Sequence, residues 1–448
     1  MKLWDKGDRL AEEVEQFTIG KDPQLDLLLA PYDVLASIAH AKMLQTVGLL
    51  SPDEGEQLCK ALQGLYRRIE QGRFRIEKGV EDVHSQIELE LTRQLGDLGK
   101  KIHAGRSRND QVLVALRLFI RDQLRDIVQE IQKLFHRLLE LSEANQDVFL
   151  PGYTHLQPAM PSTFGLWFAA YAESLVDDLI LLAAACDIIN KNPLGSAAGY
   201  GTSLPIDRSL TTRLLGFESL NVNVVYAQMG RGKSERVVSM ALASPAHTLS
   251  RLAYDMCLYM NPHFDFVRFP QELTTGSSIM PHKKNPDVWE LIRARCNQLQ
   301  ALPNEMVLIS NNLPSGYHRD MQVLKEHFLP AFATLLDCLR MAMKMLRHIQ
   351  INRDLRQDDR YRLLFSVEAV NALVLEGMPF REAYHIIADE IQRGEFDPEK
   401  YKNRHDAVVF HEGHARNLMN DSIRETMERI VGRFPFQTWQ EALSQLLK

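Results

Sequence analysis

The feature that most constrains the fold is a sustained apolar repeat in the first third of the chain. After residue 111, leucine and isoleucine recur every three or four positions, at Leu113, Leu116, Ile120, Leu124, Ile127, Ile131, Leu134, Leu138 and Leu141. One apolar stripe held over about eight turns predicts a single long helix packed against other helices. A helix of about 30 residues is about 45 Å long, so the repeat predicts an elongated body.

Four further long segments follow the same helical pattern. Residues 163–190 are apolar nearly all round, as expected of a helix surrounded by others. Helices are also predicted over 233–260, over 287–312 with a kink at Pro303, and over about 322–351. Strand signals are scarce, and residues 221–226 are predicted as a short strand. The fold class expected is therefore all-α, with an elongated long-helix bundle at its centre.

The 448 residues are enough for two or three domains. We predict an N-terminal mostly helical domain at 1–106, a central bundle at 107–354 and a small helical domain at 355–448. Shorter helices are expected in the two flanking domains, over 33–50, after the break at 51–52, and over 82–95, 363–376, 381–393 and 421–432. The long helices have more apolar face than one five-helix bundle can bury, which predicts oligomerisation.

Charge, hydropathy and cysteine content indicate which partners and which cellular location to expect. The net charge of −6 gives no basic footprint for nucleic acid. The most apolar long run, 166–189, carries four acidic residues, which favours a buried helix over a membrane span. Five scattered cysteines without CxxC spacing, and a charged stretch at Met1–Leu10, favour a reducing, cytoplasmic location. We therefore predict a cytoplasmic protein with no nucleic-acid or membrane partner.

A polar loop at residues 275–287 reads Thr-Gly-Ser-Ser-Ile-Met-Pro-His-Lys-Lys-Asn-Pro-Asp. We expect Asn285 to cap the following helix, with Pro286 at its first position. The hydroxyl of Ser277 would then lie beside Lys283 and the positive end of a helix dipole, which suits an anionic ligand. The alternative is a polar surface loop before a capped helix.

Two other polar blocks stand out. His155 lies in a segment whose prolines, Pro158 and Pro161, exclude a regular helix, so a fixed histidine able to act as acid or base is one interpretation. A structural histidine in a turn is the other. Arg106, Ser107 and Asn109 precede the long helix and could clamp carboxylates, or simply form a solvated charged cap.

Together these blocks resemble a known family. The loop Gly276–Pro286 and the block Thr-His-x-Gln-Pro-Ala at 154–159 resemble the signature segments of the fumarase/aspartase superfamily, whose members eliminate fumarate. The run Gly-Arg-Ser-Arg-Asn-Asp-Gln at 105–111 and the segment 317–325 are similar to those of argininosuccinate lyases and their δ-crystallin relatives. Ser37 matches a family substrate contact.

The resemblance implies an activity and a set of roles. It implies reversible cleavage of argininosuccinate to L-arginine and fumarate, the step that yields arginine in its biosynthesis. Ser277 would be the base, Lys283 and Asn285 would hold the substrate carboxylate, and His155 would be the acid, oriented by Glu290; the sequence leaves open which of Ser277 and His155 moves which proton. Substrate-positioning residues would be Ser37, Arg106, Ser107, Asn109, Thr154, Tyr317, Gln322 and Lys325.

The resemblance further implies a homotetramer with each site shared between chains, and no cofactor or metal. The chain departs from the family pattern at His282, at His318-Arg319 and at Val323-Leu324. His282 is the residue usual in adenylosuccinate lyases, so adenylosuccinate lyase, or another fumarate-releasing lyase of the superfamily, is the enzymatic alternative. A crystallin-like structural protein is the non-enzymatic one.

Overall fold

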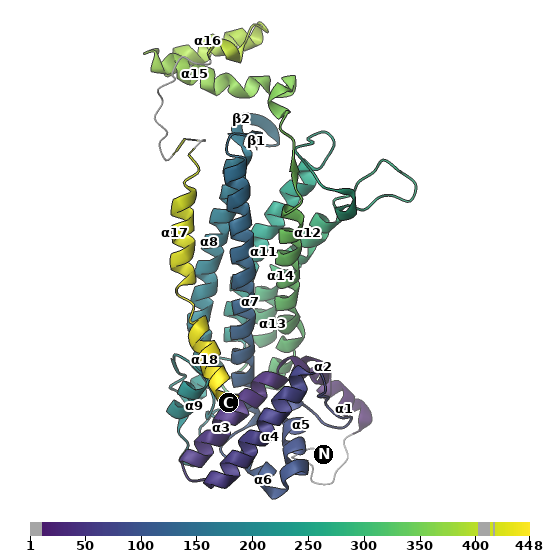
Figure 1. Ribbon diagram of the computed structural model, residues 1–448, viewed down its shortest axis with the longest axis vertical. Coiled ribbons are helices and arrows are strands. Elements are labelled where there is room, and N and C mark those ends of the chain that lie inside the picture. Colours follow the sequence, from purple (N-terminus) through teal and green to yellow (C-terminus); the bar gives the residue numbers. More distant parts are fainter. Residues whose placement is uncertain (1–10, 402–412, 415–416) are drawn as a thin grey trace.

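The computed structural model describes residues 11–401, 413–414 and 417–448; the stretch Met1–Leu10, used above to predict location, lies outside these ranges. Long helices run side by side along the longest axis of the molecule (Figure 1). The strands assigned in the described residues form only three two-stranded sheets. The predicted fold class, an all-α protein built on an elongated long-helix bundle, is confirmed.

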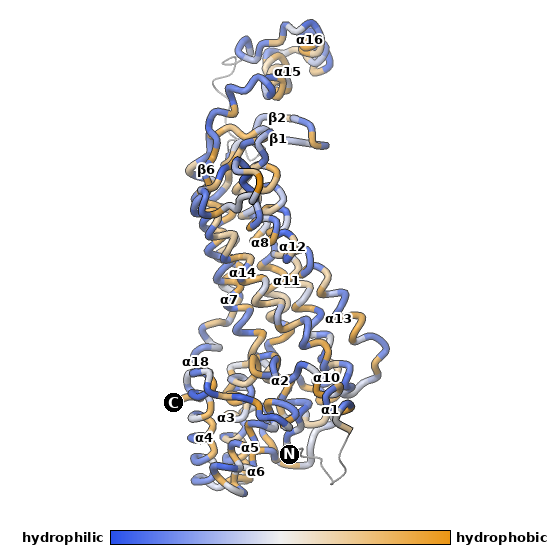
Figure 2. The backbone as a smooth tube through the Cα atoms, turned by 90° about the vertical axis from the view of Figure 1, so that its right-hand side faces the viewer, coloured by the Kyte–Doolittle hydropathy of each residue, from blue (hydrophilic) through white to orange (hydrophobic). Residues whose placement is uncertain are grey.

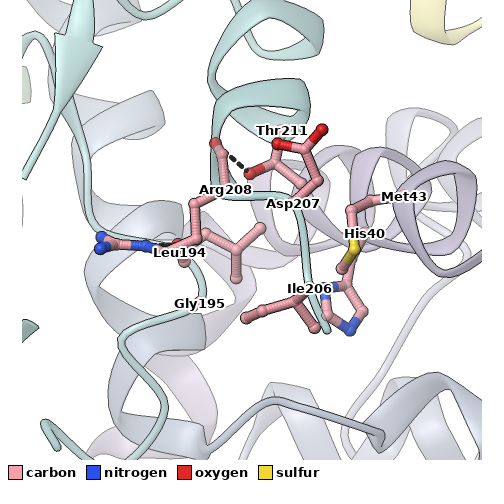
Figure 3. A pocket seen from close by; sticks show the side chains of 8 residues that line it. All are labelled: His40, Met43, Leu194, Gly195, Ile206, Asp207, Arg208 and Thr211. Carbon is pink, nitrogen blue, oxygen red and sulfur yellow. Dashed lines mark hydrogen bonds between the residues drawn. The ribbon is translucent and has the colours of Figure 1, made fainter. Parts of the chain in front are cut away.

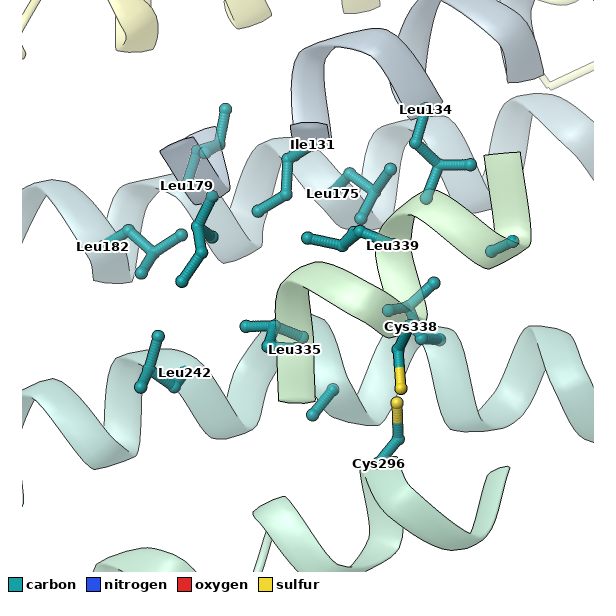
Figure 4. Close-up of a cluster of buried hydrophobic side chains, with 14 of the residues drawn as sticks. Ile131, Leu134, Leu175, Leu179, Leu182, Leu242, Cys296, Leu335, Cys338 and Leu339 are labelled. Carbon is teal, nitrogen blue, oxygen red and sulfur yellow. The ribbon is translucent and has the colours of Figure 1, made fainter. Parts of the chain in front are cut away.

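The central bundle is built from four long helices and two shorter ones. They are α7 (Arg108–Ala144), α8 (Phe164–Ile189), α11 (Lys233–Tyr259), α12 (Asp287–Leu299), α13 (Leu302–Ser310) and α14 (Leu324–Leu346). The 37 residues of α7 span about 55 Å. Hydrophobic residues line the bundle along its length (Figure 2). Figure 4 shows leucines of α8, α11 and α14 meeting in the core, where the sulfurs of Cys296 and Cys338 face each other.

Three sequence expectations about these elements are wrong. The segment 287–312 is two helices separated at residues 300–301, because Pro303 sits in the first turn of α13 and starts a new helix instead of kinking one. Residues 221–226 are no strand: the side chain of Asn223 accepts from the Tyr226 N–H and caps α10 (Val224–Met229), which outweighs the β-branched valines. The end of the fifth long helix, 350–351, is instead strand β6.

The N-terminal helices pack across one end of the bundle, which we call the base (Figure 1). They are α1 (Glu12–Ile19), α2 (Asp22–Leu25), α3 (Ala30–Thr46), α4 (Pro52–Glu70), α5 (Val83–Leu95) and α6 (Asp97–Lys100). Their apolar side chains form a core of their own, centred on α3 and α4 and continued by Val114 and Leu118 of α7. The base is thereby joined to the first turns of α7.

At the opposite end, which we call the hairpin end, β1 (Phe149–Thr154) and β2 (Gln157–Thr163) form an antiparallel hairpin between α7 and α8. The other strands are short: β3 (Lys191–Asn192) pairs in parallel with β4 (Ser219–Leu220), and β5 (Val267–Arg268) pairs antiparallel with β6 (Gln350–Ile351). Helix α9 (Arg208–Leu214) lies at the base. The hairpin therefore marks the end of the helical bundle opposite the N-terminal helices.

The C-terminal helices fall into two parts. Helices α15 (Ser366–Leu375) and α16 (Phe380–Gln392) have a small core of their own beyond the hairpin end. Helix α17 (Asn420–Val431) returns along α8, and α18 (Phe436–Leu446) reaches α3 and α9 at the base (Figure 1). There Trp439 packs over the buried Arg121 guanidinium at 4.4 Å. The predicted unit 355–448 contains both parts, and the domain boundaries stay a prediction.

In the part of the chain that the structure describes, no single helix has the length and apolar character to cross a membrane. One pair of consecutive helical segments, 13–28 and 30–46, reaches that length and composition only when taken together, and it is bent by 76°. The second segment, α3, is mostly buried against the rest of the protein.

Candidate active site

The predicted site residues lie in two groups at opposite ends of one chain. His155 follows the end of α7, whereas Asn109 lies in its first turn, so about 55 Å of helix separates their blocks. Thr154, Ser277, Lys283, Asn285 and Glu290 belong to the part toward the hairpin end, and Ser37, Arg106, Ser107, Tyr317, Gln322 and Lys325 to the base. One chain alone does not bring the two groups together.

His155 occupies a strained turn. Thr154 pairs with Gln157 across the hairpin, so His155 and Leu156 form its two-residue connection. Both have positive φ angles, 54° and 59°, as a tight hairpin turn requires. Glycine and asparagine usually fill these positions, and other residues are strained there by about 1–3 kcal/mol each. Thr154, His155 and Leu156 are all exposed. An exposed histidine held in a strained turn favours the functional interpretation of this block over the purely structural one.

The segment 275–285 forms a loop closed at its neck. The Asn285 N–H donates to the Thr275 carbonyl at 2.8 Å, and the Asn285 side-chain amide donates to the Gly276 carbonyl at 3.3 Å. Between these residues the chain extends away from the bundle (Figure 1). The prediction that Asn285 caps the next helix is wrong: Pro286 holds the N-cap position and α12 begins at Asp287. The side chain of Asn285 is used to close the loop instead.

Within this loop, the hydroxyl oxygen of Ser277 accepts two backbone hydrogen bonds. The donors are the N–H groups of Ile279, at 3.3 Å, and Met280, at 3.2 Å. Lys283 is exposed in the same loop, and Ile279 is 82% exposed at its tip. Two backbone donors would stabilise negative charge on the Ser277 oxygen, as required of a serine that removes a proton.

Glu290 lies on the first turn of α12 with about half of its side chain exposed. Its carboxylate is 4.0 Å from the Arg293 guanidinium. Among the described residues, no hydrogen bond joins Glu290 to His155 within this chain. The proposed orienting contact between the two is therefore left as a prediction about the assembled protein.

At the base, Arg106 and Ser37 are buried together. The Arg106 guanidinium donates to the Ser37 hydroxyl of α3 at 2.8 Å. Burial lowers the pKa of Arg106, an effect that Asp33 and Asp110 oppose. Ser107 caps α7, accepting from the Asn109 N–H at 3.3 Å, and the Asn109 side chain is half-buried in that first turn. These contacts place Ser37, Ser107 and Asn109 around the start of α7.

Gln322 and Lys325 hold the N-terminal segment against the bundle. The Gln322 amide donates to the carbonyls of Thr18 and Ile19, at 3.0 and 3.1 Å. The buried Lys325 ammonium contacts the carboxylates of Asp22 and Asp26, each at 2.7 Å. Tyr317, which is 40% exposed, lies just before these residues in the chain. Direct substrate contacts by Gln322 and Lys325 remain a prediction, because both side chains already have protein partners.

Sequence reasoning missed two groups beside this part of the site. Asp110 receives three backbone N–H bonds, from Ser107, Gly195 and Ala197. Glu81 pairs with Arg108 at 3.0 Å and with Arg319 at 2.6 Å, so Arg319, one of the departures from the family pattern, forms an ion pair with the N-terminal helical region. The Ser-x-x-Asp spacing of a capping box was the available signal for Asp110. Nothing local in the sequence indicates the Glu81 pairs.

Comparisons with known proteins identify relatives of this chain. The protein-family model described as Lyase matches residues 9–301. Argininosuccinate lyase of Parabacteroides distasonis is 56% identical over 446 residues, covering 100% of this chain and 99% of the relative. That of Phocaeicola vulgatus is also 56% identical with the same coverage. That of Thermotoga neapolitana is 40% identical over 88% of this chain and 98% of the relative.

Solved structures share the fold. EDDS lyase in complex with formate superposes with a TM-score of 0.73 at 22% identity, covering 98% of this chain and 93% of that one. Class II fumarase from Schistosoma mansoni superposes with a TM-score of 0.70 at 17% identity, covering 93% and 95%. The long-helix bundle is thus the fold of these enzymes. With full-length relatives more than half identical, the chain belongs to the argininosuccinate lyase family, within the fumarase/aspartase superfamily.

Proposed function

We propose that the protein catalyses the reversible elimination of argininosuccinate to L-arginine and fumarate, as a step of arginine biosynthesis in the cytoplasm. The observation that carries this proposal is the 56% identity to proteins named argininosuccinate lyase over the full length of both chains. The other support is chemical: the loop at 275–285 joins a serine hydroxyl to two backbone donors and an exposed lysine, which suits a reaction that builds negative charge on a carboxylate.

In the first step, Ser277 removes the proton from the carbon next to a substrate carboxylate. The electron pair left on that carbon is delocalised into the carboxylate, which becomes a doubly charged aci-carboxylate. Lys283 and Asn285 are proposed to hold this carboxylate as its charge grows. The N–H groups of Ile279 and Met280 reduce the free energy needed to deprotonate Ser277, because both already donate to its oxygen.

In the second step, the carbon–nitrogen bond breaks and fumarate forms. His155 delivers a proton, directly or through water, to the departing guanidinium nitrogen, and Glu290 orients the imidazole. The remaining predicted residues would bind and position argininosuccinate: Ser37, Arg106, Ser107, Asn109, Thr154, Tyr317, Gln322 and Lys325.

We further propose that the enzyme is a homotetramer whose sites are shared between chains. The support is the separation of the two groups of site residues by the length of α7. Large apolar side chains are also exposed on the flanks of the bundle helices, which favours packing against other copies; they include Ile180, Leu181, Met240, Leu291 and Leu308. Antiparallel packing of bundles would bring the base of one chain to the hairpin end of another.

The test is fumarate release with argininosuccinate and adenylosuccinate measured side by side. We expect turnover of argininosuccinate and a kcat/KM for adenylosuccinate at least about 100-fold lower, a difference of about 2.8 kcal/mol in transition-state binding. The reason is that the blocks at 105–111 and 317–325 both follow the argininosuccinate pattern, against one residue, His282, that follows the other. Comparable kcat/KM values would refute this substrate assignment, and no turnover of either would favour a crystallin-like structural role.

A further inference from the structure

We propose that Asp110 is a positioning residue for substrate binding: its carboxylate joins the first turn of α7, which carries Ser107 and Asn109, to the glycine-rich turn at 195–201. The inference rests on the proposed function, because its readout is the handling of argininosuccinate. Asp110 does not itself face the substrate, since its side chain is fully buried.

The carboxylate of Asp110 is shared between two distant segments. One oxygen accepts the Ser107 N–H at 2.8 Å and completes the capping box of α7. The other oxygen accepts the N–H groups of Gly195 and Ala197, at 2.9 and 3.0 Å. A helix cap alone needs only the first of these bonds. The two bonds to the turn are additional, and they tie residues more than 80 positions apart in the chain.

The carboxylate helps to fix the shape of the turn. Gly195 and Ala197 both have positive φ angles, 83° and 51°, and the two bonds from Asp110 add to the turn's own backbone bonds, such as that from the Gly201 N–H to the Ser196 carbonyl at 3.0 Å. Figure 3 shows Gly195 beside Ile206 and Arg208, in a hollow with no room for a water molecule. A Cβ atom at Gly195 would lie 2.8 Å from a side-chain carbon of Arg208. The turn therefore packs against Arg208 of α9 on one side and is hydrogen-bonded to Asp110 on the other.

The far end of the same turn, at Tyr200, approaches the segment 317–325, which carries other proposed substrate-binding residues. Tyr200, which is 70% exposed, has its hydroxyl 3.4 Å from the position of a Cβ on Gly316, the neighbour of Tyr317. At the base of the molecule, the glycine-rich turn thus lies between the start of α7, which carries Asn109, and the segment that carries Tyr317. A shift at Asp110 would move the start of α7 relative to the glycine-rich turn at 195–201. The proposed substrate-binding surface, which includes Asn109 and Tyr317, would then change shape.

The hydrogen-bond geometry favours a carboxylate over an amide here, although burial disfavours its charge. Burial raises the pKa of Asp110 to about 6, while the three N–H bonds and the Arg106 guanidinium oppose that rise. An asparagine can present only one oxygen. Its NH₂ group would face either the Ser107 N–H or the N–H groups of Gly195 and Ala197, donor against donor. One of the two segments must then move away.

The experiment is steady-state kinetics of argininosuccinate cleavage by Asp110→Asn. We expect KM to rise about tenfold or more while kcat stays within about threefold of wild type, because binding geometry and not proton transfer is disturbed. The matched control is Asp207→Asn at the N-cap of α9, where the side chain accepts a single N–H, from Leu210 at 2.9 Å. This control should leave KM unchanged, since one acceptor oxygen remains on asparagine.

A second variant guards against failure of Asp110→Asn to fold. Gly195→Ala disturbs the turn from the α9 side and leaves the capping box of α7 intact, so it should raise KM in the same way. If KM is unchanged in a folded Asp110→Asn, or in Gly195→Ala where Asp110→Asn does not fold, Asp110 is only a helix cap and the inference is wrong. A wild-type protein that releases no fumarate would contradict the proposed function and would be recognised before any variant is compared.

Discussion

Three aspartates, of which Asp110 and Asp178 are buried and Asp22 is half-buried, show how position changes the chemistry of one residue type. Burial raises the pKa of Asp22, Asp110 and Asp178 to about 6 in each case. Their partners differ: Lys325 and Asp26 for Asp22, backbone N–H groups for Asp110, and the hydroxyls of Ser244 and Thr248, at 2.5 and 2.7 Å, for Asp178. Only the last carboxylate has neutral hydroxyl partners that an amide could equally satisfy.

We therefore predict that Asp178→Asn stabilises the protein at pH 8. The pKa of Asp178 is raised above the ordinary 3.8, so the folded state holds the proton more tightly, and wild-type stability falls as pH rises from about 4 to about 6. Asparagine removes this penalty, which is about 1–3 kcal/mol. The thermal unfolding midpoint should rise at pH 8 and stay close to wild type at pH 4.

Glu173→Gln, at an exposed position of the same helix, is the control and should change the midpoint little at either pH. A lower midpoint for Asp178→Asn at pH 8 would mean that the ionised carboxylate stabilises the bundle, contrary to the direction of its pKa shift.

At the scale of elements, the N-terminal segment 12–28 is held to the bundle by polar contacts from two neighbouring residues. Gln322 donates to Thr18 and Ile19, and Lys325 pairs with Asp22 and Asp26. Burial disfavours the charge of Lys325, but the two carboxylates outweigh burial and raise the pKa of its ammonium group. Gln322 and Lys325, which are predicted to contact the substrate, thus also attach the first helices to the bundle.

Lys325→Met should destabilise this attachment. The substitution leaves Asp22 and Asp26 buried without a counterion, a change that typically destabilises a protein by about 3–5 kcal/mol. We expect a lower thermal midpoint and faster backbone hydrogen exchange in residues 12–28 than elsewhere. Lys133→Met, which removes an exposed ion pair with Glu130, is the control and should leave both unchanged. If hydrogen exchange in residues 12–28 stays at the wild-type rate while substrate binding is lost, Lys325 instead contacts the substrate directly.

At the scale of the whole molecule, sharing of sites between chains predicts complementation. His155→Asn and Ser277→Ala should each be inactive alone, because each removes one partner of the proton transfers. Equal amounts unfolded and refolded together should form mixed tetramers in which roughly one quarter of the sites carry both native residues. The recovered fraction of wild-type fumarate release is the measurement.

The control is each variant refolded alone, which should stay inactive. Mixed tetramers, identified by a mass tag on one variant, that recover no activity would show that His155 and Ser277 of one site come from the same chain. That result would contradict a site in which His155 and Ser277 come from different chains, while leaving the reaction itself unchanged.

Much of the fold followed from local pattern. The apolar stripe from Leu113 to Leu141 predicted α7 because helix periodicity is a property of neighbouring residues. The errors arose where contacts override local preference: Asn223 caps a helix among strand-favouring valines, and residues 350–351 leave the helix to pair with β5. Helix α18 was missed; in the folded chain its Trp439 packs on Arg121 of α7.

The proposed chemistry of this protein rests on short local blocks that the sequence already shows: the serine loop, the histidine turn and the arginine–asparagine block at the start of α7. The arrangement of these blocks in space does not follow from the local sequence. Within one chain, α7 separates the arginine–asparagine block from the histidine turn by about 55 Å. Further partners, such as Asp110 for the turn at 195–201 and Glu81 for Arg319, come from far along the sequence. Periodicity and motif spacing depend on nearby residues, whereas such pairings depend on which buried groups the folded chain brings within hydrogen-bonding distance.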